Sequence, residues 1–110
     1  MINQDQISEI KKRKKKLFTF LKISSKKEEL DFLEKEILKS NFWENTKKAE
    51  KTLKRKKEIE NWVKAFNSIE NNLEELNILI ELNAEVNEIN LRYDDIINLL
   101  ENLEFKKMLS

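Results

Sequence analysis

The side chains that most often carry catalysis or hold metals are missing from this sequence, which contains no His and no Cys. The most conspicuous remaining candidates are two adjacent carboxylate pairs, Glu74-Glu75 and Asp94-Asp95. Neighbouring residues on a helix point about 100° apart, so neither pair can converge on a shared proton or metal ion. We therefore expect no catalytic residue, no bound metal and no enzymatic activity.

Phosphate-cradling loops are excluded by the absence of Gly, because such loops need backbone conformations that other residues adopt poorly. The same absence, together with the lack of EF-hand spacing, argues against a calcium loop. No cofactor is expected. Since Pro is missing as well, tight hairpins are improbable and the composition favours helices over strands.

Two basic runs are candidate RNA contacts, because lysine and arginine neutralise phosphates. The first run winds around its helix as a collar and has no aromatic platform for reading bases. These positions are Lys11, Lys12, Arg13, Lys14, Lys15 and Lys16, followed by Lys54, Arg55, Lys56 and Lys57. Two alternatives remain: a solvated surface enriched in lysine by AT-rich coding DNA, and a basic amphipathic helix over residues 7–23 that lies on a membrane.

Large aromatic residues form a second group. Phe42 and Trp43 occupy a polar connection and need burial, and Trp62 and Phe66 lie one turn apart on the following helix. We expect these four side chains to form one structural cluster at the end of a helix bundle.

Hydrophobic periodicity predicts an all-α fold of four to five helices, arranged as one domain over residues 1–110. A first helix over residues 5–23 should end at Ser24-Ser25. Ser25 and Glu28 have the spacing of a capping box for a second helix that ends near Ser40-Asn41. Asn45 is expected to cap the third helix.

The third and fourth helices carry the strongest repeats, with apolar residues at alternating steps of three and four. A turn at Asn83-Ala84-Glu85 would let the two seams bury each other in a long antiparallel pair that dominates the bundle. An unbroken helix across this point would instead expose both seams. The seams are Ile59, Trp62, Phe66, Ile69, Leu73, Leu76 and Ile80, and then Val86, Ile89, Tyr93, Ile96, Leu100 and Leu103.

Two ordered motifs give the chain a family resemblance. Phe42-Trp43-Glu44-Asn45, with Ala49-Glu50 and Trp62 after it, is followed much later by the segment from Leu103 to Leu109. With these features the chain resembles the N-terminal helical domain of bacterial peptide chain release factor 2. It departs from that pattern at Asn45-Thr46, where the family has an acidic residue and a helix-starting Pro.

The resemblance implies a docking domain of a factor that reads stop codons and triggers hydrolysis of peptidyl-tRNA. In that family both activities belong to downstream domains, through a Gly-Gly-Gln loop and a Ser-Pro-Phe motif, so the chain looks truncated. The implied partners are the ribosome, through its stalk-base protein and ribosomal RNA, and a recycling GTPase. We expect a cytoplasmic monomer with no membrane contact.

Two other classes of function stay open. The chain could be a tRNA-binding helical arm like that of seryl-tRNA synthetase, where a long antiparallel pair also carries basic residues. It could also be a coiled-coil protein that homodimerises through the two seams. The Phe42-Trp43 connection argues against the first of these, because such an arm has no aromatic plug.

Overall fold

The computed structural model describes all residues from Met1 to Ser110, and its secondary structure is entirely helical. The elements are α1 (Gln4–Phe20), α2 (Ile23–Glu36), the short 3₁₀ helix η1 (Phe42–Glu44), α3 (Thr46–Glu81) and α4 (Val86–Leu109). The predicted all-α fold with a dominant antiparallel pair is confirmed.

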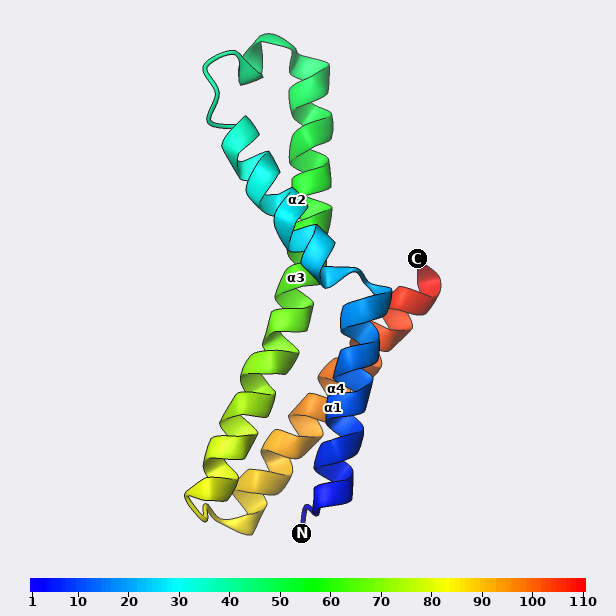
Figure 1. The fold of residues 1–110 in the computed structure, drawn as a ribbon, viewed down its shortest axis with the longest axis vertical. Coiled ribbons are helices and arrows are strands. Elements are labelled where there is room, and N and C mark those ends of the chain that lie inside the picture. The colour runs from blue at the N-terminus through cyan, green and yellow to red at the C-terminus, as the bar shows by residue number, and fades with distance from the viewer.

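The long helix α3 sets the shape of the molecule. Its 36 residues rise by about 1.5 Å each and span about 54 Å, close to the longest molecular dimension of 58 Å. The C-terminal half of α3 packs with α4 and α1, and we call this part the lower bundle (Figure 1). The N-terminal half packs with α2 and η1 and projects away from the bundle as an arm.

The core lies in the lower bundle and at its junction with the arm. Phe66, Ile69 and Leu76 on α3 face Ile96 and Leu100 on α4, and all five are at most 1% exposed. Helix α1 and the residue that follows it cover this pair with an apolar stripe. Buried members of the stripe are Ile7, Ile10, Leu17 and Leu21. The centres of both predicted seams are thus the centre of the core.

The turn between α3 and α4 falls where it was predicted. Asn83 adopts a left-handed conformation with φ of 52°, and the Ala84 amide donates to the Leu79 carbonyl at 3.0 Å. The ends of the two seams behave differently from the prediction, because Ile80 is 37% exposed and Val86 is 48% exposed. No further element covers this end of the pair, so both side chains meet solvent.

The boundary between the first two helices was predicted wrongly. α1 ends at Phe20, and Ser24 and Ser25 lie inside the first turn of α2. The residue preceding α2 is Lys22, at φ 50° and ψ 51°, and no side chain caps the helix. The break is placed by burial of Leu21 and Ile23 on either side of it, which outweighs the local capping signal of Ser25 and Glu28.

Two asparagines cap helices as local chemistry dictates. The Asn45 side chain accepts from the Lys48 amide at 3.1 Å, as predicted for the start of α3. Asn3 and Gln6 form a reciprocal capping box at the start of α1 that was not predicted from the sequence.

None of these helices is both long enough and apolar enough to cross a bilayer.

Candidate nucleic-acid interface

The basic run on α1 divides between the bundle and solvent. Arg13 donates from Nε and Nη2 to the two carboxylate oxygens of Glu104 on α4, at 3.0 and 2.6 Å. Lys14 lies 3.6 Å from the carboxylate of Glu70 on α3. The other four side chains are exposed and have no carboxylate within 4.0 Å, and we call them the collar lysines: Lys11, Lys12, Lys15 and Lys16.

The hydrogen bonds between Arg13 and Glu104 have an electrostatic consequence. They raise the pKa of the Arg13 guanidinium above its ordinary value, against the smaller opposing effect of burial. The pair joins α1 to the C-terminal part of α4. Its two groups therefore stabilise the bundle and are not available to bind phosphate. The predicted six-residue collar therefore reduces to four available charges.

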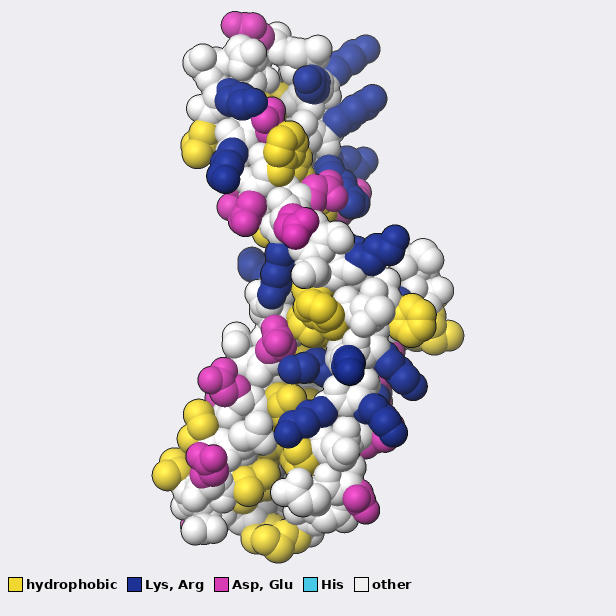
Figure 2. Space-filling model, viewed as in Figure 1, with side chains coloured by type: hydrophobic (Ala, Val, Ile, Leu, Met, Phe, Trp, Pro, Cys, Tyr) yellow, Lys and Arg dark blue, Asp and Glu magenta, His cyan; other side chains and the backbone are white.

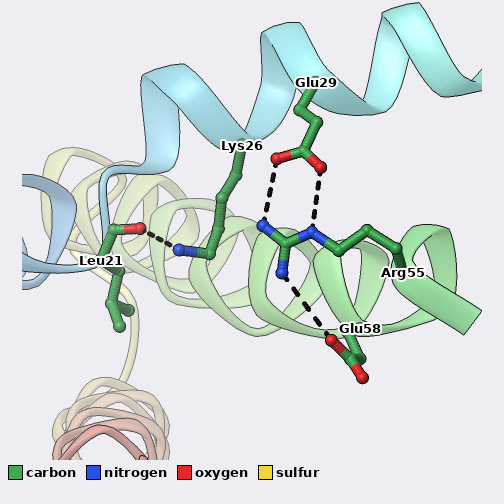
Figure 3. Close-up of polar contacts among 5 residues, drawn as sticks. All are labelled: Leu21, Lys26, Glu29, Arg55 and Glu58. Atoms are coloured by element: carbon green, nitrogen blue, oxygen red, sulfur yellow. Dashed lines mark hydrogen bonds and ion pairs between the residues drawn. The ribbon is translucent and has the colours of Figure 1, made fainter.

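The second basic run, on α3, is also partly occupied. Arg55 makes two hydrogen bonds to Glu29 on α2, at 2.9 and 3.0 Å, and lies 3.7 Å from Glu58 (Figure 3). Lys56 pairs with Glu60 one turn further along the same helix. Lys54 and Lys57 are exposed and unpaired.

These pairs shift the pKa values of their members in opposite directions. The hydrogen bond to Arg55 lowers the pKa of the Glu29 carboxyl, and the bond to Glu29 raises the pKa of Arg55. Close by, burial and then the positive charge of Arg55 lower the pKa of Lys26. The Lys26 ammonium donates to the Leu21 carbonyl at 2.5 Å, which satisfies a backbone acceptor at the break before α2 (Figure 3).

The basic surface of the arm extends further than was predicted, because Lys47 and Lys51 join the predicted Lys54. Lys47, Lys51 and Lys54 follow one another at steps of four and three, which places them on one face of α3. All three are exposed and unpaired, and we call them the arm lysines. Figure 2 shows dark blue side chains projecting from one edge of the arm. Their helical spacing was the signal that could have found them.

The predicted cluster of four aromatic residues does not form. Phe42 and Trp43 pack edge to face at the tip of the arm, with ring centroids 4.8 Å apart, and Trp43 remains 62% exposed. Phe66 lies in the bundle core, where its ring is 5.6 Å from that of Phe18. Trp62 is 16 residues beyond the start of α3, which separates it from the tip by about 24 Å of helix.

The two tryptophans have different environments and therefore different roles. Trp62 is partly buried against the core and lies beneath the ammonium groups of Lys106 at 4.5 Å and Lys26 at 6.0 Å. Its indole therefore holds the bundle and the arm together. Trp43, by contrast, presents an exposed indole that directly precedes the helix of the arm lysines, and such a surface suits stacking on an unpaired base.

The carboxylate pairs contribute nothing to a shared site. Glu74, Glu75, Asp94 and Asp95 are all exposed, and Glu75 is engaged by Arg92 at 3.0 Å. No group of three or more His, Cys, Asp or Glu side chains is arranged to hold a metal ion. The chemistry that this surface supports best is the binding of phosphates by unpaired lysines.

Comparison with known proteins agrees with the resemblance read from the motifs. The chain is 28% identical over 96 residues to peptide chain release factor 2 of Petrotoga mobilis (strain DSM 10674 / SJ95). The matched region is 87% of this chain and 26% of the relative, so the chain spans about a quarter of that protein's length. No protein-family model matches the sequence. No solved structure matches it either. The similarity relates this chain distantly to a region of a translation termination factor.

Proposed function

We propose that the chain is an accessory docking domain of a class I translation termination factor of the release factor 2 type. It would help to hold such a factor on the ribosome without hydrolysing peptidyl-tRNA itself. The observation that carries this proposal is the similarity to peptide chain release factor 2 across 96 residues. Because the chain spans 26% of that relative, we assign stop-codon reading and hydrolysis to other parts of such a factor.

The distribution of available charge supports a docking role. Collar and arm lysines together present seven unpaired cations on α1 and α3, while the net charge of the chain is only +1. Phosphate contacts position a protein on RNA without requiring base recognition. Ribosomal RNA at the stalk base, the adjacent stalk protein and a recycling GTPase in the cytoplasm are the partners that we propose.

The seams support a monomer over a coiled-coil dimer. Ile69, Leu76, Ile96 and Leu100 are all fully buried within one chain, so little of either seam is left for a partner copy. The tRNA-binding alternative uses the same lysines, and it is separated from the proposed function by the choice of RNA in the test.

The test is a titration of the chain with purified bacterial 70S ribosomes at increasing salt, followed by pelleting. We expect binding that weakens with salt, because lysines that contact phosphates release counterions. The variant Lys47→Gln with Lys51→Gln should lower the slope of log affinity against log salt by about 0.7 to 0.9 for each phosphate that these lysines neutralise.

The matched control is Lys27→Gln with Lys35→Gln, which removes two exposed, unpaired charges from α2. This control should leave the slope unchanged. An equal reduction in both variants would mean that only net charge matters and would contradict a docking surface. Tighter binding to isolated tRNA than to ribosomes would favour the tRNA-binding alternative.

A further inference from the structure

The free end of the α3–α4 hairpin is an exposed apolar surface. Ile78 lies in the last turn of α3 and Leu82 directly follows that helix, and they are 48% and 72% exposed. Ile80 and Val86 flank the turn. We call these four residues the hairpin end. Two of them, Ile80 and Val86, line a depression of about 290 Å³ together with Ile2, Ala84 and Ile89. The side chains there are arranged to receive apolar groups.

The charged side chains next to the turn are all acidic. No Lys or Arg occurs between Lys64 and Arg92, although the chain has 22 basic residues. Within this stretch Glu70 and Glu75 are paired with cations of other helices. Glu81, Glu85 and Glu88 lie next to the turn and have no such partner. Figure 2 shows hydrophobic and acidic side chains at this end of the molecule, with no dark blue among them.

We propose that the hairpin end docks a protein partner that presents a basic amphipathic helix. Apolar side chains of that helix would enter the depression beside Val86, and its Lys or Arg side chains would pair with Glu81, Glu85 and Glu88. All three glutamates are exposed and lack an ion pair within the chain. This inference rests on the docking function proposed above and assigns its protein contact to the end opposite the arm.

Charge complementarity selects this occupant over others. RNA and anionic lipid surfaces would be repelled by the glutamates that surround the hairpin end. A second copy would bring two identical acidic surfaces together across a two-fold axis, which costs free energy. A basic helix with an apolar face satisfies both the apolar surface and the carboxylates.

The test uses a helical peptide made of two copies of the heptad Leu-Lys-Lys-Leu-Leu-Lys-Leu, with binding followed by fluorescence anisotropy and by amide chemical shifts. We expect the largest shifts at residues 78–91. Ile80→Gln with Val86→Gln should weaken binding by about tenfold or more, because two apolar side chains that line the depression no longer pack against the peptide. Glu81→Gln with Glu85→Gln should weaken binding and reduce its salt dependence.

The matched control is Phe105→Gln with Met108→Gln, which changes two exposed apolar residues near the C-terminal end of α4. The control should leave the affinity unchanged, and an analogue of the peptide with Glu in place of Lys should not bind. Shifts centred on residues 105–109, or equal weakening by both apolar variants, would overturn the proposal. So would a concentration-dependent dimer that Leu82→Gln abolishes.

The two proposals fail in different ways. Peptide binding does not involve the ribosome, so its weakening in the hairpin-end variants is independent of the arm lysines. The docking function would stand and this inference would fall if Lys47→Gln with Lys51→Gln changed ribosome binding while the hairpin-end variants left the peptide affinity unchanged.

Discussion

At the scale of single residues, ion pairing decides which basic side chains are available for a ligand. Arg13 is paired with Glu104, which is 91 positions away, and Arg55 with Glu29, which is 26 positions away. Pairings of this kind depend on which helix faces meet, so spacing along the chain could not reveal them. The pair between Lys56 and Glu60, by contrast, has the one-turn spacing that makes it predictable.

The pair between Glu29 and Arg55 predicts a pH-dependent contribution to stability. The hydrogen bond from Arg55 lowers the pKa of Glu29 in the folded chain, whereas an unfolded Glu titrates near about 4.3. The contribution is therefore present above the unfolded pKa and is lost as pH falls through the folded pKa. We expect Glu29→Gln to lower the free energy of unfolding by about 0.5 to 1 kcal/mol at neutral pH, where both partners are screened by solvent.

Urea unfolding followed by circular dichroism at pH 7 and at about pH 2 measures this difference, which should vanish at the lower pH. Asp31→Asn on the same helix is the control, since Asp31 is exposed and unpaired. A destabilisation by Glu29→Gln that is as large in acid as at neutral pH would contradict the role of the charge.

At the scale of helices, capping and turn residues predict the structure correctly where no tertiary contact opposes them. The Asn45 side chain caps α3, and Asn83 adopts the left-handed conformation of the hairpin turn. Each of these effects involves only residues a few positions apart in the sequence. The expected cap at Ser25 failed for the opposite reason. Leu21 and Ile23 are both buried, and their burial fixes the break three residues earlier than the polar signal does.

The break before α2 predicts a stabilising substitution. Lys22 adopts φ 50° and ψ 51°, a left-handed conformation that costs a residue with a Cβ atom roughly 1 to 2 kcal/mol. Glycine removes this cost but loses more entropy on folding, so Lys22→Gly should raise the free energy of unfolding by about 0.5 to 1 kcal/mol. Thermal and urea unfolding at neutral pH measure the change.

The comparison variant is Lys27→Gly, which removes the same exposed side chain from within α2. Glycine inside a helix should cost about 1 kcal/mol. Opposite signs for the two variants are expected, and destabilisation by both would show that the Lys22 side chain contributes more than its backbone strain costs.

At the scale of the whole molecule, the rigid length of α3 separates features that sequence reasoning placed together. Trp43 and Trp62 were expected in one cluster, and the helix between them holds one at the tip of the arm and the other at its base. The helix periodicity was sufficient to predict the pairing of α3 with α4. It could not predict that α2 would pair with the first half of α3, away from the bundle, because either half offers an apolar face.

This division predicts unequal stability along the molecule. The thirteen-residue core cluster contains residues from α1, α4, the C-terminal half of α3 and the α1–α2 junction. Outside it only Ala49, Ile59 and Val63 are buried, and Leu30 and Leu33 of α2 are half-buried. Because burial of apolar area is the main stabilising contribution, the arm should open more easily than the bundle.

Native-state hydrogen exchange read by NMR measures this directly. We expect amides of residues 26–36 and 50–58 to exchange with opening free energies roughly a few kcal/mol below those of residues 69–76 and 96–103. Leu33→Ala should lower protection in the arm alone. Ile96→Ala, which removes a fully buried side chain, should lower protection in the bundle by about 2 to 5 kcal/mol. Equal protection in both parts would mean that α3 couples them into one cooperative unit, because a break within this continuous helix would then cost more than opening the sparsely packed arm.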